Sequence, residues 1–281
     1  MKKLFKRSIT GAVYVAVVVA ALAAGSEHAF MAVFALLAIL GVNELHNIAR
    51  DKSAPTGSSS AIKTIDLLGA AAIFTGAFAV MSGRCLALTA ALPVLAYFIV
   101  RMVTQLYIRS TNPLKDLAVS ALCMAYVAAP VALLNVTYFR HSPQLLLAAL
   151  ILIWVNDTGA YCVGSLIGRH RLFLKVSPKK SWEGFWGGMA FCVVTALIFN
   201  HLNEYFGDMS LTCWIGYSLI VAVFATWGDL CESLIKRTMH VKDSGNLLPG
   251  HGGILDRIDS LLIVSPAILI YLTLLTRLAA G

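Results

Sequence analysis

The chain has 281 residues, of which 59% are apolar and only 13% are charged, and its mean hydropathy is +0.80. A soluble domain carries about 25% charged residues, so this composition excludes an ordinary soluble protein and predicts a polytopic membrane protein. The formal net charge is +8, but the basic residues form no stripe interleaved with aromatic residues. In a membrane protein the placement of basic residues along the chain is more informative than the net charge. We therefore expect no nucleic-acid partner.

Nine apolar segments come close to the length of a membrane-spanning helix, at about 1.5 Å of rise per residue. They fall at about residues 8–26, 29–45, 64–82, 85–103, 116–138, 145–168, 184–200, 211–230 and 260–279. The first follows MKKLFKR and resembles a signal peptide, yet we expect it to remain as an uncleaved span. The predicted fold is an all-α, polytopic transmembrane helical bundle. It forms one integral membrane domain, in which 1–140 supply the N-terminal spans and 141–281 the spans and loops that carry the chemistry.

The basic residues also predict an orientation. If the N-terminus is cytoplasmic, the loops on that side contain all but three of the 22 Lys and Arg, leaving Arg84, Arg140 and Arg277 outside. The positive-inside rule therefore predicts a cytoplasmic N-terminus. The two richest polar segments, 169–183 and 231–259, then face the cytoplasm, where nucleotides can reach them.

Asp157 interrupts the middle of the sixth apolar segment, within the run WVNDTGAY. An ionisable group at that depth costs about 2.5–3.5 kcal/mol on insertion scales and indicates a functional site. The alternative is a structural hydrogen bond between helices, made by a protonated or Asn-paired Asp157.

Polar side chains also share one helical face at the end of the eighth segment. They fall at i, i+3, i+4 and i+7 and are Asp229, Glu232, Ser233 and Lys236. An ordinary interfacial cap is the alternative. Asp256 and Asp259, three residues apart at the entry of the last span, can likewise point the same way.

The segment 231–259 combines cations, carboxylates and glycines in a short stretch. Its Lys and Arg suit a phosphorylated substrate, and its Asp residues suit a hard cation such as Mg²⁺. The glycines Gly250, Gly252 and Gly253 allow backbone to approach a ligand closely. His251 can orient a phosphate or a leaving group, or can make a structural hydrogen bond. No Cys-x-x-Cys or His-Cys cluster supports zinc.

A second polar segment, Ser177 to Gly184, has the sequence SPKKSWEG. Its two adjacent lysines and two serines can bind phosphate, while Pro178 and Gly184 fix the turn before the seventh span. The alternative is a positively charged anchor with an interfacial Trp.

The last polar segment fits the pattern S-x-x-K-R-x-x-x-x-K-D, a spacer, P-G-H-G-G, two residues and D-R-x-D. Its fixed positions are Ser233, Lys236, Arg237, Lys242, Asp243, Pro249, Gly250, His251, Gly252, Gly253, Asp256, Arg257 and Asp259. With this pattern the chain resembles the bacterial phosphatidate cytidylyltransferases, also called CDP-diacylglycerol synthases. The resemblance extends to 156–161 and 177–184, whereas the first 140 residues match only as generic spans.

The resemblance implies that CTP and phosphatidic acid react to CDP-diacylglycerol and pyrophosphate, in phospholipid biosynthesis at the bacterial inner membrane, with the site facing the cytoplasm. It implies Mg²⁺, a second monovalent cation such as K⁺, and a homodimer. Asp229 and Asp256 are expected to bind Mg²⁺, with Asp157 and Asp259 in support. The expected catalytic set is Asp229, Asp256, Lys236, Arg237, Lys242, His251 and Arg257, whose Lys and Arg side chains neutralise the CTP phosphates. The expected substrate-binding set is Ser177, Lys179, Lys180, Ser181, Glu183, Ser233, Asp243, Gly250, Gly252 and Gly253.

Three other classes fit less well. A CTP-dependent polyprenol or dolichol kinase would transfer the γ-phosphoryl group and would need a base near the acceptor hydroxyl. A CDP-alcohol phosphotransferase would carry a D-G-x-x-A-R motif, which this sequence lacks. An ion-coupled transporter would explain Asp157 but not the phosphate-binding groups gathered on one side.

Overall fold

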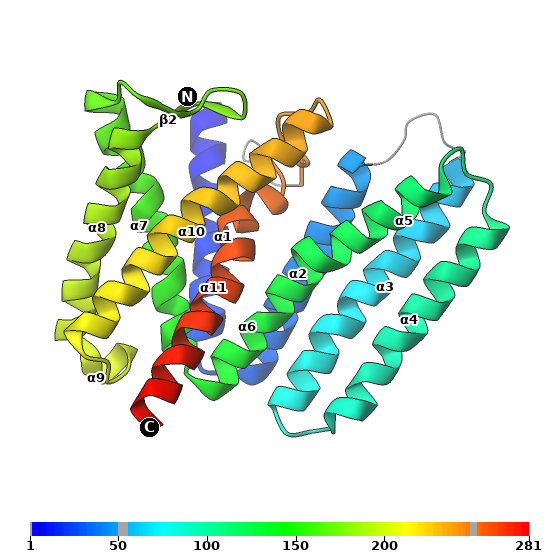
Figure 1. Ribbon diagram of the computed structural model, residues 1–281, viewed down its shortest axis with the longest axis horizontal. Coiled ribbons are helices and arrows are strands. Elements are labelled where there is room, and N and C mark those ends of the chain that lie inside the picture. Colours follow the sequence, from blue (N-terminus) through cyan, green and yellow to red (C-terminus); the bar gives the residue numbers. More distant parts are fainter. Residues whose placement is uncertain (1, 50–55, 248–251, 281) are drawn as a thin grey trace. The chain divides into compact units, whose positions relative to one another are not determined.

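The computed structural model describes residues 2–49, 56–247 and 252–280 and is built almost entirely of helices (Figure 1). The helices are α1 (Lys2–Ala23), α2 (Glu27–Ala49), α3 (Thr56–Met81), α4 (Ala87–Tyr107), α5 (Pro113–Leu122), the π-helix η1 (Cys123–Ala128), α6 (Ala129–Arg140), α7 (Pro143–Ile167), α8 (Trp182–His201), α9 (Asn203–Phe206), α10 (Leu211–Thr238) and α11 (Leu255–Ala280). The strands β1 (Arg171–Phe173) and β2 (Ser177–Ser181) form one small hairpin. The prediction of an all-α polytopic fold is confirmed.

Each apolar segment expected from the sequence coincides with a helix, and the segment 116–138 coincides with the continuous run α5–η1–α6. Within the described ranges, eight helices are long and apolar enough to cross a membrane, whereas α1 contributes the shorter apolar stretch Gly11–Ala23. Nine spans and a cytoplasmic N-terminus therefore stay predictions.

The chain divides into two compact units that do not follow the simple division at residue 140. Unit 1 comprises Met1–Arg140 and Asp243–Ile258, and unit 2 comprises His141–Lys242 and Asp259–Gly281. Part of the 231–259 motif thus packs with the N-terminal helices, which the sequence did not predict.

In unit 1, α3 packs against α2, α4 and α6 (Figure 1). Aromatic side chains fill the contacts among these helices. The rings of Phe30 on α2 and Tyr138 on α6 stack with centroids 4.1 Å apart, and the centroid of Phe74 on α3 lies 6.1 Å from that of Phe30. The π-helical turn η1 ends two residues before Pro130, and its last bond runs from the Ala129 N–H to the Met124 carbonyl. Proline has no N–H to donate, so a locally widened turn is tolerated at this position.

In unit 2, α7, α8 and α10 pack against one another (Figure 1). The approach of α8 to α7 depends on small residues, because a Cβ added to Gly188 would lie 2.5 Å from Asn156 Oδ1 and 2.8 Å from Asn156 O. Ser142 and Ser210 cap the N-termini of α7 and α10 by accepting backbone N–H bonds.

The hairpin between α7 and α8 pairs Arg171 with Ser181 and Phe173 with Ser177, with a register irregularity between the two pairs. The rings of Phe173 and Trp227 meet edge to face at 5.7 Å, which attaches the hairpin to α10. Only a turn was predicted here, because β2, with its Pro and two Lys, lacks the alternation of apolar residues that usually indicates a strand.

A buried polar network joins the helices of unit 1. Asp66 is fully buried and accepts hydrogen bonds from Ser120 at 2.7 Å and from Tyr97 at 3.1 Å. Arg101, 3% exposed, has its Nε 3.7 Å from Asp66 Oδ1 and 2.8 Å from Ser120 Oγ. His46 Nε2 lies 3.4 Å from the same carboxylate. These groups compensate a charge that apolar surroundings would otherwise penalise.

Arg101→Met is expected to destabilise the protein by about 3–5 kcal/mol, because it leaves the Asp66 carboxylate without its cation. The measurement is the midpoint of thermal unfolding in detergent. The matched control is Arg109→Met, since Arg109 is exposed just beyond the same helix. Equal midpoints for wild type and Arg101→Met would show that the pair contributes nothing.

Candidate functional site

A cavity of about 550 Å³ opens in unit 2 among α7, the hairpin, α8 and α10. Its polar lining consists of Asn156, Asp157, Tyr161, Ser165, Arg171, Lys179, Lys180, Ser181, Thr226 and Asp229. The structure thus brings together five residues that the sequence singled out in three separate segments. They are Asp157, Lys179, Lys180, Ser181 and Asp229.

Lys180 is fixed inside this cavity. Its Nζ lies 2.7 Å from Asp229 Oδ2 and donates to the Thr226 carbonyl at 3.4 Å. Lys179 is exposed at the neighbouring position of β2. The hairpin therefore directs two adjacent cations to one cavity, as a phosphate-binding segment requires.

Ser181 and Glu183 have structural partners of their own. Ser181 is buried and caps α8 by accepting the Gly184 N–H at 3.1 Å. Glu183 lies 2.6 Å from His170 Nδ1 and accepts the backbone N–H of His170. Glu183 also lines a second, open cavity of about 720 Å³ beside Trp182 and Trp186. Its role in substrate binding stays a prediction.

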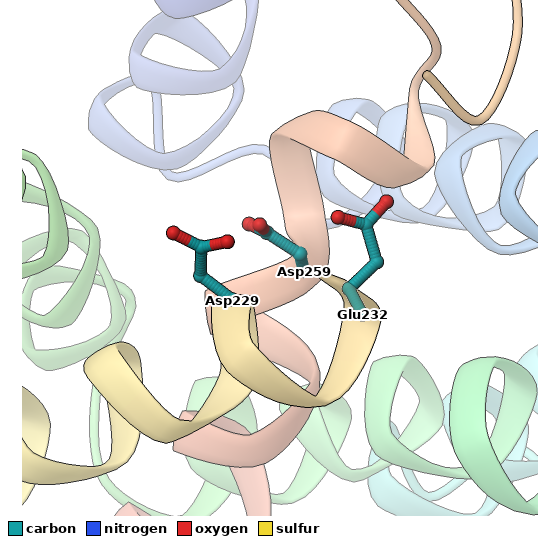
Figure 2. Close-up of side chains that lie close together, drawn as sticks. All are labelled: Asp229, Glu232 and Asp259. Carbon is teal, nitrogen blue, oxygen red and sulfur yellow. The ribbon is translucent and has the colours of Figure 1, made fainter. Parts of the chain in front are cut away.

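Three carboxylates meet between α10 and α11, as Figure 2 shows. One oxygen from each of Asp229, Glu232 and Asp259 lies within 4.8 Å of the others. Asp229 and Glu232 are one turn apart on α10, and Asp259 reaches them from α11. Because Asp229 also lines the cavity of Lys180, the carboxylate cluster and the cationic cavity are adjacent.

Gly228 explains how α11 comes so close to α10. A Cβ added to Gly228 would lie 2.8 Å from Ser260 Cα and 2.9 Å from the Asp259 carbonyl, so a larger residue would separate the helices. Ser260 Oγ donates to the Ala225 carbonyl at 3.0 Å across the same contact.

The surroundings of the cluster suit a hard cation. Lys236 Nζ pairs with Glu232 at 2.5 Å, Lys180 pairs with Asp229, and Ser233 Oγ donates to Asp229 at 3.2 Å. Two ammonium groups thus face three carboxylates, and oxygen ligands of this kind fit Mg²⁺. Glu232 was predicted to share this face but was not among the predicted metal ligands, although its i, i+3 spacing from Asp229 was the available signal.

Other predicted residues belong to unit 1. Asp256, in unit 1, accepts the N–H of Ser244 at 3.0 Å and that of Gly253 at 2.8 Å. Gly252 has a φ of +83°, and a Cβ there would lie 2.5 Å from Asp256 Oδ2, so only glycine fits. The metal-binding role of Asp256 stays a prediction, as does that of Asp157.

Several cations and one acid of the motif are exposed, namely Arg237, Lys242, Asp243 and Arg257. Arg237 donates to the Val241 carbonyl at 3.4 Å, and Ser177 is half-buried in β2. Gly250 and His251, which the sequence placed in the site, lie outside the described residues.

Residues 5–275 match the Cytidylyltransferase family, and the chain belongs to that family. The phosphatidate cytidylyltransferase of Haemophilus influenzae is 43% identical over 163 residues, which cover 56% of this chain and 57% of that relative. The enzyme of the same name from Staphylococcus aureus is 47% identical over 129 residues, covering 45% and 48%. The chain thus spans about half the length of the curated relatives it matches. The family resemblance inferred from the motif is confirmed.

Glu232→Gln and Asp259→Asn are each expected to weaken binding of Mn²⁺, used as a spectroscopic substitute for Mg²⁺, because each removes an anionic oxygen ligand from the cluster. The measurement is an electron paramagnetic resonance titration of purified protein in detergent. Glu204→Gln, an exposed carboxylate on α9 of the same unit, should leave binding unchanged.

The same titration distinguishes between two possible sets of metal ligands, the carboxylate cluster seen in the structure and the set predicted from the sequence. If Asp157→Asn and Asp256→Asn weaken Mn²⁺ binding while Glu232→Gln does not, the cluster assignment is wrong.

Proposed function

We propose that this protein transfers the cytidylyl group of CTP to phosphatidic acid, giving CDP-diacylglycerol and pyrophosphate. The observation that carries the proposal is the adjacency of a lysine-bearing cavity and a three-carboxylate cluster, which share Asp229. Family membership and the names of the relatives support it.

In the proposed reaction a phosphate oxygen of phosphatidate attacks the α-phosphorus of CTP. The bond from this phosphorus to the α–β bridging oxygen breaks, and pyrophosphate leaves. The nucleophile is already anionic near pH 7, so no covalent enzyme intermediate is needed. The main difficulty is to bring two polyanions together, which positioning and cationic side chains overcome.

Specific side chains have distinct tasks in this proposal. Lys179 and Lys180 hold the phosphate of the lipid in the cavity, and the bonds of Lys180 to Asp229 and the Thr226 carbonyl fix its ammonium in place. Lys236 and the exposed cations Arg237, Lys242 and Arg257 neutralise the CTP phosphates and the leaving pyrophosphate.

Asp229, Glu232 and Asp259 would hold Mg²⁺, with Asp157 and Asp256 as further candidates. When bound, Mg²⁺ would supply positive charge to phosphate oxygens. The surplus of carboxylates also leaves room for the second monovalent cation that the motif implies.

The proposal includes a location and partners. The eight apolar helices found among the described residues suit a multi-pass protein. The placement of basic residues favours a site at the cytoplasmic face of the bacterial inner membrane. Trp182 and Trp186 line the open cavity, and we expect this aromatic pair to lie at the level of the lipid headgroups. A homodimer is expected from the motif resemblance.

Purified protein with phosphatidic acid, Mg²⁺ and CTP should transfer an α-phosphate label, but not a γ-phosphate label, into lipid and release pyrophosphate. Transfer of γ-label to an added polyprenol would instead identify a kinase. If neither label moves, the proposed reaction is wrong.

Lys180→Met is expected to lower kcat/KM by about 100-fold, because it removes a fixed cation from the reacting phosphates. The control is Lys175→Met, which removes an exposed lysine of the same hairpin that lines neither cavity. Similar losses in both variants would show that the effect is not specific to Lys180.

A further inference from the structure

Glu44 makes contacts that the sequence did not predict. It lies on α2, in a stretch that resembled only a generic span, and is 4% exposed. Its carboxylate accepts the backbone N–H groups of Ile254 and Leu255, both at 2.9 Å, and the hydroxyl of Ser244 at 2.8 Å. A carboxylate on α2 thus binds two amides at the start of α11.

The contacts of Glu44 continue to Asp256 through Ser244. The hydroxyl proton of Ser244 goes to Glu44, so its oxygen accepts the Asp256 N–H at 3.3 Å. The Asp256 carboxylate in turn accepts the N–H groups of Ser244 and Gly253. Glu44, Ser244 and Asp256 therefore form one closed hydrogen-bonded network, which ties Ser244 to the start of α11.

Two glycines lie beside this network, at positions where a larger residue would have no space for its side chain. A Cβ on Gly245 would lie 2.7 Å from Glu44 Oε1, and a Cβ on Gly253 would overlap both Glu44 Oε2 and Ser244 Oγ. Gly253 is a fixed position of the motif. The glycine at position 253 therefore leaves the space that the Glu44 side chain occupies, although Glu44 lies 209 residues earlier in the sequence.

We propose that Glu44 is a positioning residue for cytidylyl transfer. It fixes both Ser244 and the first turn of α11, and so determines the direction in which Asp256 and Arg257 project. This inference rests on the proposed function. The proposed role of Glu44 exceeds that of a helix cap, because Ser244 Oγ donates to Glu44 and also accepts the Asp256 N–H.

Glu44→Ala and Ser244→Ala test the proposal in the full-length protein in detergent. Each should lower kcat per folded molecule by about 10- to 100-fold, the usual effect of losing a group that orients a catalytic carboxylate. The KM for phosphatidate should stay within about twofold, because the lysines assigned to lipid phosphate belong to the other unit. Glu44→Gln should retain an intermediate kcat, since its amide oxygen still accepts a hydrogen bond.

Hydrogen–deuterium exchange provides a readout that is independent of activity. The Ile254 and Leu255 amides should exchange faster in Glu44→Ala than in wild type. The matched control is Glu27→Gln, which changes an exposed carboxylate on the same helix that pairs with Arg84 at 3.1 Å. This control should match wild type in both exchange and kinetics.

The outcomes separate the two proposals. An inactive wild type contradicts the proposed function, whereas exchange still reports on the Glu44 contacts. If wild type is active but folded Glu44→Ala and Ser244→Ala keep its kcat, Glu44 is only structural and the inference is wrong. If Glu44→Ala does not fold, Glu44→Gln and Ser244→Ala decide by the same criterion.

Discussion

An ionised side chain inside an apolar helical protein costs several kcal/mol unless another group compensates its charge, and this constraint shapes both units. Asp66 is compensated by Arg101 and by hydroxyl donors. Glu44 is compensated by backbone amides. At the α10–α11 contact, however, three carboxylates face two ammonium groups. The meeting of three carboxyl groups distinguishes a site suited to a cation from the networks around Asp66 and Glu44, in each of which one carboxylate is surrounded by donors.

Much of the fold was predictable because its main signal is local. Long apolar segments coincide with helices, and the polar interruptions mark the cavity residues Asp157, Lys179 and Lys180. Helical spacing also anticipated that Asp229 and Glu232 share a face. What sequence could not predict depends on contacts between distant segments. The approach of Asp259 requires Gly228 to lie against α11, and the partners of Glu44 lie about 200 residues away.

The division of the motif between two units has a similar origin. Of the motif, the residues up to Lys242 belong to unit 2, Asp243–Ile258 belong to unit 1, and Asp259 belongs to unit 2 again. Asp256 and Asp259 lie one turn apart on the same helix. The Asp256 carboxylate accepts the N–H groups of Ser244 and Gly253, whereas the Asp259 carboxylate lies beside those of α10. Spacing alone predicted that the two side chains point the same way. Their hydrogen bonds differ.

The long separation between Glu44 and its amide donors also sets an order of assembly during synthesis. The donors lie 210 and 211 residues after Glu44, and translation at about 5–20 residues per second delays them by roughly 10–40 s. Through that interval the Glu44 carboxyl group has none of these partners. The nascent N-terminal helices must therefore leave it in contact with water or with other donors. The contacts of unit 1 are complete only after Ile258 has been made.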